Sequence, residues 1–308
     1  MRACAGLLGH NISYSLSPAM HNAAFEHLGL DIRYRVFDLN HREAFRFLKA
    51  IQGFGPAWQG EPLVGMNVTI PHKQLAADSA QRRSSVVEAI NACNTLLFQQ
   101  DQEKGGPEGT TAILADNTDS TGFSRALGAS LGFNPRGRSA LILGAGGAAA
   151  AAAYALLRDG IAGVVMANRS PGRARKAIRG LRAALDDPQR ARLTALPTDS
   201  LDRDDWAEAL GSVDLVVNAT PLGGPGREGL LALPYPQLLA GHQALYDMNY
   251  RPLTTLLMSE ASKQGCSVAG GLSMLLYQGA ESFRLWTGRD APLEVMAKAL
   301  EEGVKRCQ

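Results

Sequence analysis

Two ionisable side chains in the first part of the chain could together move a proton. Lys73 ends the segment GMNVTIPHK, residues 65–73, and Asp119 lies in DNTDS, residues 116–120. Oxidation of an alcohol needs a base that takes the hydroxyl proton, and reduction of the ketone needs the same group as an acid. An amine beside a carboxylate suits both directions. A lysine after a strand is often only a solvated charge, and the two positions alone do not establish that the side chains meet.

A glycine-rich turn predicts a dinucleotide site. The segment GAGGAA, residues 144–149, directly follows the apolar run LIL and directly precedes an alanine-rich helix. In this strand–turn–helix context a GxGxxG-type motif binds a pyrophosphate through backbone amides and the helix dipole. The residues expected to contact the cofactor are Gly144, Ala145, Gly146, Gly147 and Ala148. A glycine turn without a ligand is the alternative.

The residues after the next strand indicate NADP. An NAD site places Asp or Glu on the ribose 2′-hydroxyl about 20 residues beyond the turn. This chain instead has Asn168, Arg169 and Ser170, with Arg173 three residues later. Guanidinium groups make bidentate bonds to phosphate, and without an anion the helix dipole disfavours cations at a helix start. We therefore expect NADP, with NAD use as the alternative.

The order of strand-like and helix-like segments predicts an α/β protein of two domains. Residues 1–119 alternate β and α patterns, and residues 120–271 have the βαβ rhythm of a Rossmann-type doubly wound sheet. The last segment, residues 272–308, is mostly helical and is expected to pack back on the first domain. This arrangement predicts an active site in the cleft between the domains.

Turn and cap residues give more local predictions for the first domain. Ser17 is expected to cap a helix that has Pro18 in its first turn and stops at Gly29. Three further segments are assigned by composition: a loop over 53–65 before the short strand NVTI, a helix over 73–89, and a hairpin or surface loop over 99–111.

Composition argues against several classes of protein. Net charge is +2 with acids and bases interspersed, which gives no basic stripe for nucleic acid and no general attraction to a membrane surface. The four cysteines are scattered without zinc-type spacing, so we expect no metal site and a reducing, cytoplasmic setting. No apolar run approaches the roughly 18 residues of a membrane span, and the N-terminus lacks the apolar core of a signal peptide.

Nine motifs together resemble one enzyme family. In chain order they are SYSLSPAMHN (13–22), NVTIPHK (67–73), ACNTL (92–96), DNTD (116–119), GAGGAA (144–149), NRS (168–170), NATPLG (218–223), DMNY (247–250) and GLSMLLYQGA (271–280). Their identities and order resemble the shikimate/quinate dehydrogenase family over nearly the whole chain. The resemblance implies an NADPH-dependent reduction of 3-dehydroshikimate to shikimate in aromatic amino acid biosynthesis, or interconversion of quinate and its 3-keto acid.

The resemblance also implies roles for individual residues. Lys73 and Asp119 match the catalytic pair. Ser15 and Ser17 match the serines that hold the substrate carboxylate; Thr69, Asn94 and Gln278 match the residues that bond the ring hydroxyls, and Tyr250 matches a tyrosine of the same pocket. Further cofactor contacts are implied for Thr220, Pro221, Met248 and Gly271. The expected ligands are thus a small hydroxylated acid and NADP, bound by a monomer or homodimer.

Five positions depart from the family pattern. They are Tyr14 for the usual His, Asn91, Ser120 and Ser273 for Gly, and Gly224 for Met. None of them is a catalytic position, but they leave the substrate preference open. The alternatives are a quinate/shikimate paralogue with a different substrate or cofactor preference and, in another class, a non-catalytic dinucleotide or metabolite sensor.

Overall fold

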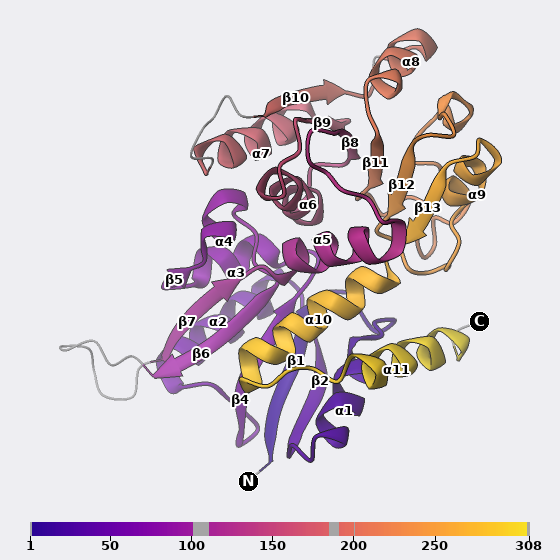
Figure 1. Ribbon diagram of the computed structural model, residues 1–308. Helices are drawn as coiled ribbons and strands as arrows, with labels where there is room; N and C mark the ends of the chain where they lie inside the picture. The colour runs from indigo at the N-terminus through magenta and orange to yellow at the C-terminus, as the bar shows by residue number, and fades with distance from the viewer. Residues whose placement is uncertain (1, 101–110, 185–190, 200, 307–308) are drawn as a thin grey trace. The chain divides into compact units, whose positions relative to one another are not determined.

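The computed structural model describes residues 2–100, 111–184, 191–199 and 201–306. The chain divides into two compact units (Figure 1). The first comprises Met1–Thr118 and Gln278–Gln308, and the second comprises Asp119–Tyr277. The chain therefore leaves the first unit after Thr118 and returns to it within a helix, α10 (Leu272–Thr287).

The first unit is built around a mixed sheet. In the described residues its strands are β1 (Ala3–Gly9), β2 (Ile32–Asp38), β3 (Ala57–Trp58), β4 (Glu61–Val68), β5 (Arg82–Arg83), β6 (Thr95–Gln100) and β7 (Thr111–Asp116), in the order β2-β1-β4-β6-β7-β5 with β3 paired to β4. Its other helices are α1 (Ser17–His27), α2 (His41–Phe54), α3 (Lys73–Ser79), α4 (Ser85–Ile90) and α11 (Leu293–Lys305). Figure 1 shows α11 beside α1, so the C-terminal helix packs on N-terminal structure.

Several strand ends of this sheet meet at one edge. β1 and β4 are parallel, with Leu8 opposite Val68 near their carboxyl ends. β6 runs antiparallel to both β4 and β7, so its first residue, Thr95, lies opposite Asn67 and Asp116. The loops that leave β1, β4 and β7 and the loop that enters β6 therefore emerge at the same edge.

The start of α1 differs from the sequence expectation. Ser17 is the first helical residue rather than the cap, because Leu16 occupies the N-cap position and no side chain caps the helix. Pro18 in the first turn is confirmed. Gly29, just beyond the helix, adopts a φ of +64°, a left-handed conformation that glycine tolerates without strain.

The loop assigned to residues 53–65 was wrong, because residues 53 and 54 end α2 and residues 57–65 belong to the hairpin of β3 and β4. Trp58 and Glu61 pair across a turn made by Gln59 and Gly60, both with positive φ, as a tight two-residue turn requires. The following strand begins at Glu61 and ends at Val68, so it starts earlier and ends earlier than NVTI suggests. Pro62 and the polar residues obscured the strand pattern.

The single helix expected over 73–89 was also wrong. α3 ends before Ala80, whose backbone is extended, and the next residues form β5, which pairs with β7. A second helix, α4, then begins at Ser85. Pairing with the sheet edge thus overrides helix propensity in this stretch. The hairpin or loop expected over 99–111 falls largely on residues 101–110, which lie outside the described residues.

The second unit is a parallel, doubly wound sheet. Its described strands are β8 (Ser139–Leu143), β9 (Gly163–Asn168), β10 (Arg192–Pro197), β11 (Leu215–Asn218), β12 (Ala244–Asp247) and β13 (Ser267–Gly270), with helices α5 (Thr118–Leu131), α6 (Gly147–Arg158), α7 (Pro171–Ala183), α8 (Arg203–Gly211) and α9 (Leu256–Lys263). The order β10-β9-β8-β11-β12-β13 is the Rossmann order 3-2-1-4-5-6. The doubly wound expectation is confirmed; β10 and α8 were not anticipated.

Chain order reverses between β8 and β11, and their carboxyl ends are where such sheets bind ligands. The four residues of β11 and the four of β12 are all buried, as expected for central parallel strands covered on both faces. The positions predicted to bind the dinucleotide lie at or just after the carboxyl ends of β8, β9, β11, β12 and β13.

Candidate functional site

The candidate substrate residues of the first unit gather at the sheet edge where four loops emerge. They are Ser15 after β1, Ser17 at the start of α1, Thr69 directly after β4, Asn94 directly before β6 and Gln278 on α10. The Ser15 hydroxyl donates to the Ser17 hydroxyl at 3.2 Å, so the two serines lie together. The Thr69 amide donates to the Leu8 carbonyl at 2.8 Å, which holds Thr69 beside β1.

Asn94 joins the loop that enters β6 to Thr118 after β7 and to Gln278 on α10. Its Oδ1 accepts from the Thr118 amide at 2.7 Å, and its Nδ2 donates to Gln278 Oε1 at 3.3 Å. The Thr118 hydroxyl also contacts Asn94. Asn94 and Gln278 are nearly buried, with exposed fractions of 2% and 8%. The structure thus brings two predicted hydroxyl-binding residues, far apart in sequence, into direct contact.

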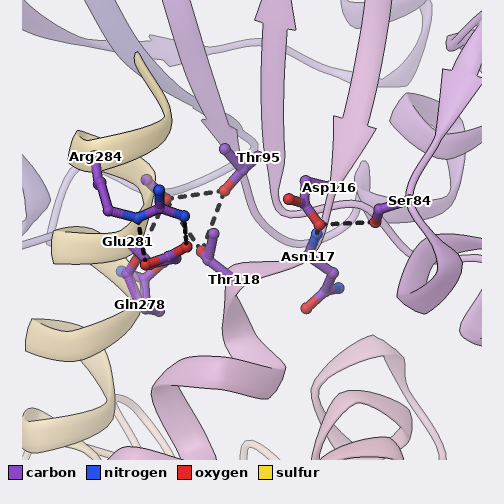
Figure 2. Close-up of polar contacts among 9 residues, drawn as sticks. Ser84, Thr95, Asp116, Asn117, Thr118, Gln278, Glu281 and Arg284 are labelled. Atoms are coloured by element: carbon purple, nitrogen blue, oxygen red, sulfur yellow. Dashed lines mark hydrogen bonds and ion pairs between the residues drawn. The ribbon is translucent and has the colours of Figure 1, made fainter. Parts of the chain in front are cut away.

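Four further polar residues support this group and were not anticipated as parts of a site. Thr95, Thr118 and Ser282 form a cluster of buried hydroxyls joined by contacts of 2.9 to 3.2 Å. Asn67 donates to Ser282 at 2.8 Å and accepts from the Tyr34 hydroxyl at 2.8 Å. Figure 2 shows Thr95 and Thr118 beside the turn of α10 that carries Gln278. The sequence signal was weak, because hydroxyl residues are common in ordinary helices and strands.

The loop that ends in Asp119 is fixed by its own hydrogen bonds. Asp116 accepts from the Ser84 hydroxyl and from the Asn117 amide, both at 2.7 Å, as Figure 2 shows for Ser84. The Asn117 side chain donates to the Ala92 carbonyl at 2.7 Å. These contacts tie the end of β7 to α4 and to the segment that precedes Asn94.

Lys73 and Asp119 occupy the first turns of α3 and α5. The Lys73 carbonyl accepts from the Cys93 amide at 2.9 Å, which places the lysine backbone next to the residue before Asn94. Asp119 is nearly buried and directly follows Thr118. A carboxylate in the first turn also stabilises its helix through the dipole. Lys73 belongs to the first unit and Asp119 opens the second, so their pairing stays a prediction.

The glycine-rich turn has the geometry of an anion-binding site. Gly144 has a φ of +112°, and a Cβ there would lie 3.2 Å from the Ala219 carbonyl, so only glycine fits between the ends of β8 and β11. A Cβ at Gly146 would have no atom within 4 Å, which leaves room for a ligand. Gly146 is also the N-cap of α6, and no side chain satisfies its first amides. These residues fit a pyrophosphate.

The turn after β9 presents cationic and polar groups. Asn168 ends β9, and its side chain donates to the Ser170 carbonyl at 2.9 Å. Ser170 is the N-cap of α7 without a side-chain cap bond, and the Arg173 amide donates to its carbonyl. Arg169 and Arg173 are exposed. The absence of a carboxylate among residues 168–173 agrees with a site for a ribose phosphate rather than a ribose hydroxyl.

A buried carboxylate organises the loops after β11 and β12. Asp247 accepts from Asn218 at 3.1 Å, from Thr255 at 2.7 Å, and from both the backbone and the side chain of Asn249. Burial raises the pKa of Asp247, and these donors oppose that shift by stabilising the charged form. Asn218 in turn accepts from the amide and hydroxyl of Thr220. Asn218 and Asp247 lie in motifs noted above but had no expected role.

The remaining predicted cofactor and substrate residues of this unit are held by this network or lie near it. Thr220 precedes Pro221, and Met248 follows Asp247. The Met248 amide donates to the Asn218 carbonyl at 2.9 Å. A Cβ at Gly271 would collide with the Met248 carbonyl, so Gly271 permits α10 to begin beside β12. Tyr250 is half-buried two residues after Met248.

Three of the departures from the family pattern have structural explanations. Asn91 caps α4 in the left-handed region at φ 48°, where asparagine is tolerated in place of glycine. The Ser273 hydroxyl contacts Ser130 at 3.0 Å and Tyr246 at 3.1 Å. A Cβ at Gly224 would lie 2.5 Å from Asn249 Oδ1, so glycine allows Asn249 to close over it. Tyr14, with 46% of its surface exposed, lies next to Ser15.

Comparison with known proteins identifies the family, through two family models and a relative similar over nearly the whole chain. A model described as the shikimate dehydrogenase substrate binding domain matches residues 7–96, and one described as the shikimate 5′-dehydrogenase C-terminal domain matches residues 271–301. A protein of Methanopyrus kandleri named shikimate dehydrogenase (NADP(+)) is 37% identical over 300 residues, which cover 97% of this chain and 95% of that protein. The chain belongs to the shikimate dehydrogenase family.

Solved structures of shikimate dehydrogenases share the fold. The enzyme from Thermus thermophilus, in complex with NADP(H) and shikimate, is 33% identical with a TM-score of 0.77, and the match covers 98% of this chain and 100% of that chain. A quinate dehydrogenase from Corynebacterium glutamicum, in complex with NAD, is 26% identical with a TM-score of 0.81, and the match covers 98% and 99%. Proteins of this fold thus include a shikimate dehydrogenase in complex with NADP(H) and a quinate dehydrogenase in complex with NAD.

Two features are missing from the residues that the structure describes in this family member. No group of three or more His, Cys, Asp or Glu side chains among them could hold a metal ion. In the same part of the chain, no helix is both long and apolar enough to cross a bilayer.

Proposed function

We propose that this chain catalyses the reversible NADP-dependent interconversion of shikimate and 3-dehydroshikimate. The observation that carries the proposal is the buried contact between Asn94 and Gln278 at the sheet edge that also holds Ser15, Ser17 and Thr69. A polyol acid needs several neutral donors and acceptors, and a site built on them rejects analogues that lack a hydroxyl. Ser15 and Ser17 would bind the carboxylate; Thr69, Asn94 and Gln278 would bind the ring hydroxyls, with Tyr250 beside them.

Lys73 is the proposed proton-transfer group. In shikimate oxidation its amine takes the proton of the reacting hydroxyl, and in the reverse reaction its ammonium returns it. Asp119 holds the lysine in place and stabilises its charged form. The short backbone path from Lys73 through Cys93 and Asn94 to Thr118 supports this pairing, because it joins the loops that carry the two residues.

The second unit is the proposed cofactor domain. Gly144, Gly146 and the first amides of α6 would bind the pyrophosphate, and Arg169 and Arg173 the 2′-phosphate. The bound dinucleotide supplies the hydride acceptor or donor. We assign the unit Met1–Thr118 with Gln278–Gln308 to the substrate domain and the unit Asp119–Tyr277 to the cofactor domain; the sequence placed these boundaries after residues 119 and 271. The cytoplasmic location and a monomeric or homodimeric state stay predictions from the sequence.

The experiment that tests this function follows NADPH formation from shikimate with wild type and Lys73→Ala. Loss of the proton acceptor should lower kcat by about 10²- to 10⁴-fold, while NADP binding, measured by calorimetry, stays within twofold. Lys49→Ala, on the exposed face of α2, is the matched control and should retain full turnover.

Each other outcome has a definite meaning. If Lys73→Ala keeps most of the wild-type turnover, the acid/base assignment is wrong. If the wild type binds shikimate and NADP but forms no NADPH, the sensor alternative is correct. A preference for quinate would assign the chain to the paralogue alternative, in keeping with the quinate dehydrogenase of the same fold.

A further inference from the structure

Ser282 lies at the centre of the buried hydroxyl cluster. It is on α10, four residues after Gln278, and has no exposed surface. Its hydroxyl donates to the Gln278 carbonyl at 3.0 Å, a bond within the helix. Its oxygen also lies 2.8 Å from Asn67 Nδ2, 2.9 Å from the Thr95 hydroxyl and 3.1 Å from the Thr118 hydroxyl.

These contacts use the full bonding capacity of one hydroxyl. A serine hydroxyl has one proton and two acceptor sites. Once the proton is donated to Gln278, the Asn67 amide occupies one acceptor site and a threonine hydroxyl the other. Because Asn67, Thr95 and Thr118 come from β4, β6 and the start of α5, Ser282 fixes one turn of α10 against three other segments.

The three segments are those that carry the candidate site. Thr95 follows Asn94 and donates to its Oδ1 at 3.0 Å. The Thr118 amide donates a hydrogen bond to the same oxygen, and Thr118 directly precedes Asp119. Gln278 lies one helical turn before Ser282 and accepts from Asn94. A shift of the Ser282 turn would therefore move Gln278 relative to Asn94.

A neighbouring threonine shows what a hydroxyl on this helix does without such a cluster. Thr287 donates to the Phe283 carbonyl at 2.8 Å, which is the same bond to the fourth preceding residue. Its oxygen also accepts from the Arg289 amide at 3.2 Å, just beyond the helix. Thr287 thus has the local contact of Ser282 but none of the links to β4, β6 and α5.

We infer that Ser282 is a positioning residue for substrate binding: its hydroxyl sets the place of Gln278 against Asn94 and so tunes affinity for the ring hydroxyls. This inference rests on the proposed function. Ser282 touches neither substrate nor cofactor in this account, and it acts through the two amide side chains that do.

The test compares Ser282→Ala with wild type in shikimate oxidation. The KM for shikimate should rise about five- to tenfold, equivalent to the loss of one or two net hydrogen bonds. The kcat should change less than threefold, because Lys73 keeps its backbone partner Cys93. The KM for NADP should be unchanged. Ser282→Thr, which keeps the hydroxyl, should restore most of the affinity, and Thr287→Val is the matched control with wild-type KM.

A second variant keeps the inference testable if Ser282→Ala does not fold. Thr95→Val removes the hydroxyl that donates to Asn94 Oδ1 beside Ser282 while preserving side-chain shape, and it should raise the same KM. Where both single variants fold, the double variant should raise KM by less than the product of the single effects, because both act on one network. Equal loss of kcat and affinity for both ligands, or unchanged KM in a folded variant, would overturn the inference. If the wild type does not turn over shikimate, the proposed function fails instead.

Discussion

At the scale of single residues, the proposed preference of the second unit for NADP depends on Arg169 and Arg173. Both are exposed at the start of α7, where the helix dipole disfavours a cation that has no anion to bind. No carboxylate follows β9 in this turn, so a ribose 2′-hydroxyl lacks its usual acceptor. The residue types thus favour a phosphate at this position.

Replacing these arginines should affect NADP and spare NAD. Arg169→Ala should raise the KM for NADP about tenfold or more, because a charge-assisted bond contributes about 1.5–3 kcal/mol, while the KM for NAD changes less than twofold. Arg179→Ala, on the exposed surface two turns along α7, is the control. Equal losses for the two cofactors would contradict the 2′-phosphate assignment, as would no loss in Arg169→Ala, Arg173→Ala or the double variant.

Residues constrained by backbone geometry were more predictable than those of the buried polar networks. Gly144 stands out in the sequence because a tight turn after a strand needs a glycine with positive φ. Ser282 and Asp247 do not stand out in the sequence, because their partners come from distant segments. Asn67, for example, lies 215 residues before Ser282. Only the folded chain reveals that these partners converge.

At the scale of one element, α1 contains a buried histidine with an unusual environment. His21 has no exposed surface, and neither ring nitrogen has a hydrogen-bond partner among the described residues. Its ring stacks on the Tyr34 ring, with the ring centroids 4.5 Å apart. The centroid of the Trp286 ring lies 5.3 Å from that of His21. Burial lowers the pKa of His21 to about 3, because the charged imidazolium cannot be solvated there.

Acid should therefore destabilise the chain through His21. Between pH 6.5 and about 3 the unfolded state binds this proton and the folded state does not, so stability falls as the pH falls. The contribution is about 2 kcal/mol between pH 7 and pH 5. His21→Phe keeps an aromatic ring on Tyr34 but should not show this pH-dependent loss of stability. Urea unfolding of both proteins at the two pH values measures this difference.

The exposed His27 near the end of the same helix provides the control. His27→Gln should follow the wild-type dependence on pH, because this variant keeps the buried His21. If His21→Phe also loses stability in parallel with wild type between pH 7 and pH 5, the assignment of the acid effect to His21 is wrong.

Element boundaries were predictable where local chemistry determines them. Pro18 lies in the first turn of α1 and Gly29 just beyond its end, as expected, although Leu16 rather than Ser17 is the N-cap. The division of residues 73–89 was not predictable, because β5 exists only through its pairing with β7, about 30 residues later in the chain. The hairpin of β3 and β4 was not predicted for a related reason. Glutamine rarely adopts a positive φ, and Gln59 does so here.

At the scale of the whole molecule, the second unit was the most predictable part. Alternating apolar strands and helices predict a parallel doubly wound sheet, and GAGGAA lies at the carboxyl end of β8, where the strand order reverses between β8 and β11. The mixed sheet of the first unit was harder to foresee, because β6 reverses direction between β4 and β7. That reversal brings Asn94 to the edge that holds Thr69 and Thr118.

The central claim is that these two units together oxidise shikimate with NADP. The most direct measurement is kcat/KM for shikimate and quinate, each with NADP and with NAD, under one set of conditions. The account predicts the highest value for shikimate with NADP, by about tenfold or more over either change of substrate or cofactor, which corresponds to one or two specific polar contacts. A higher value for quinate or for NAD, or no turnover of shikimate, would contradict it.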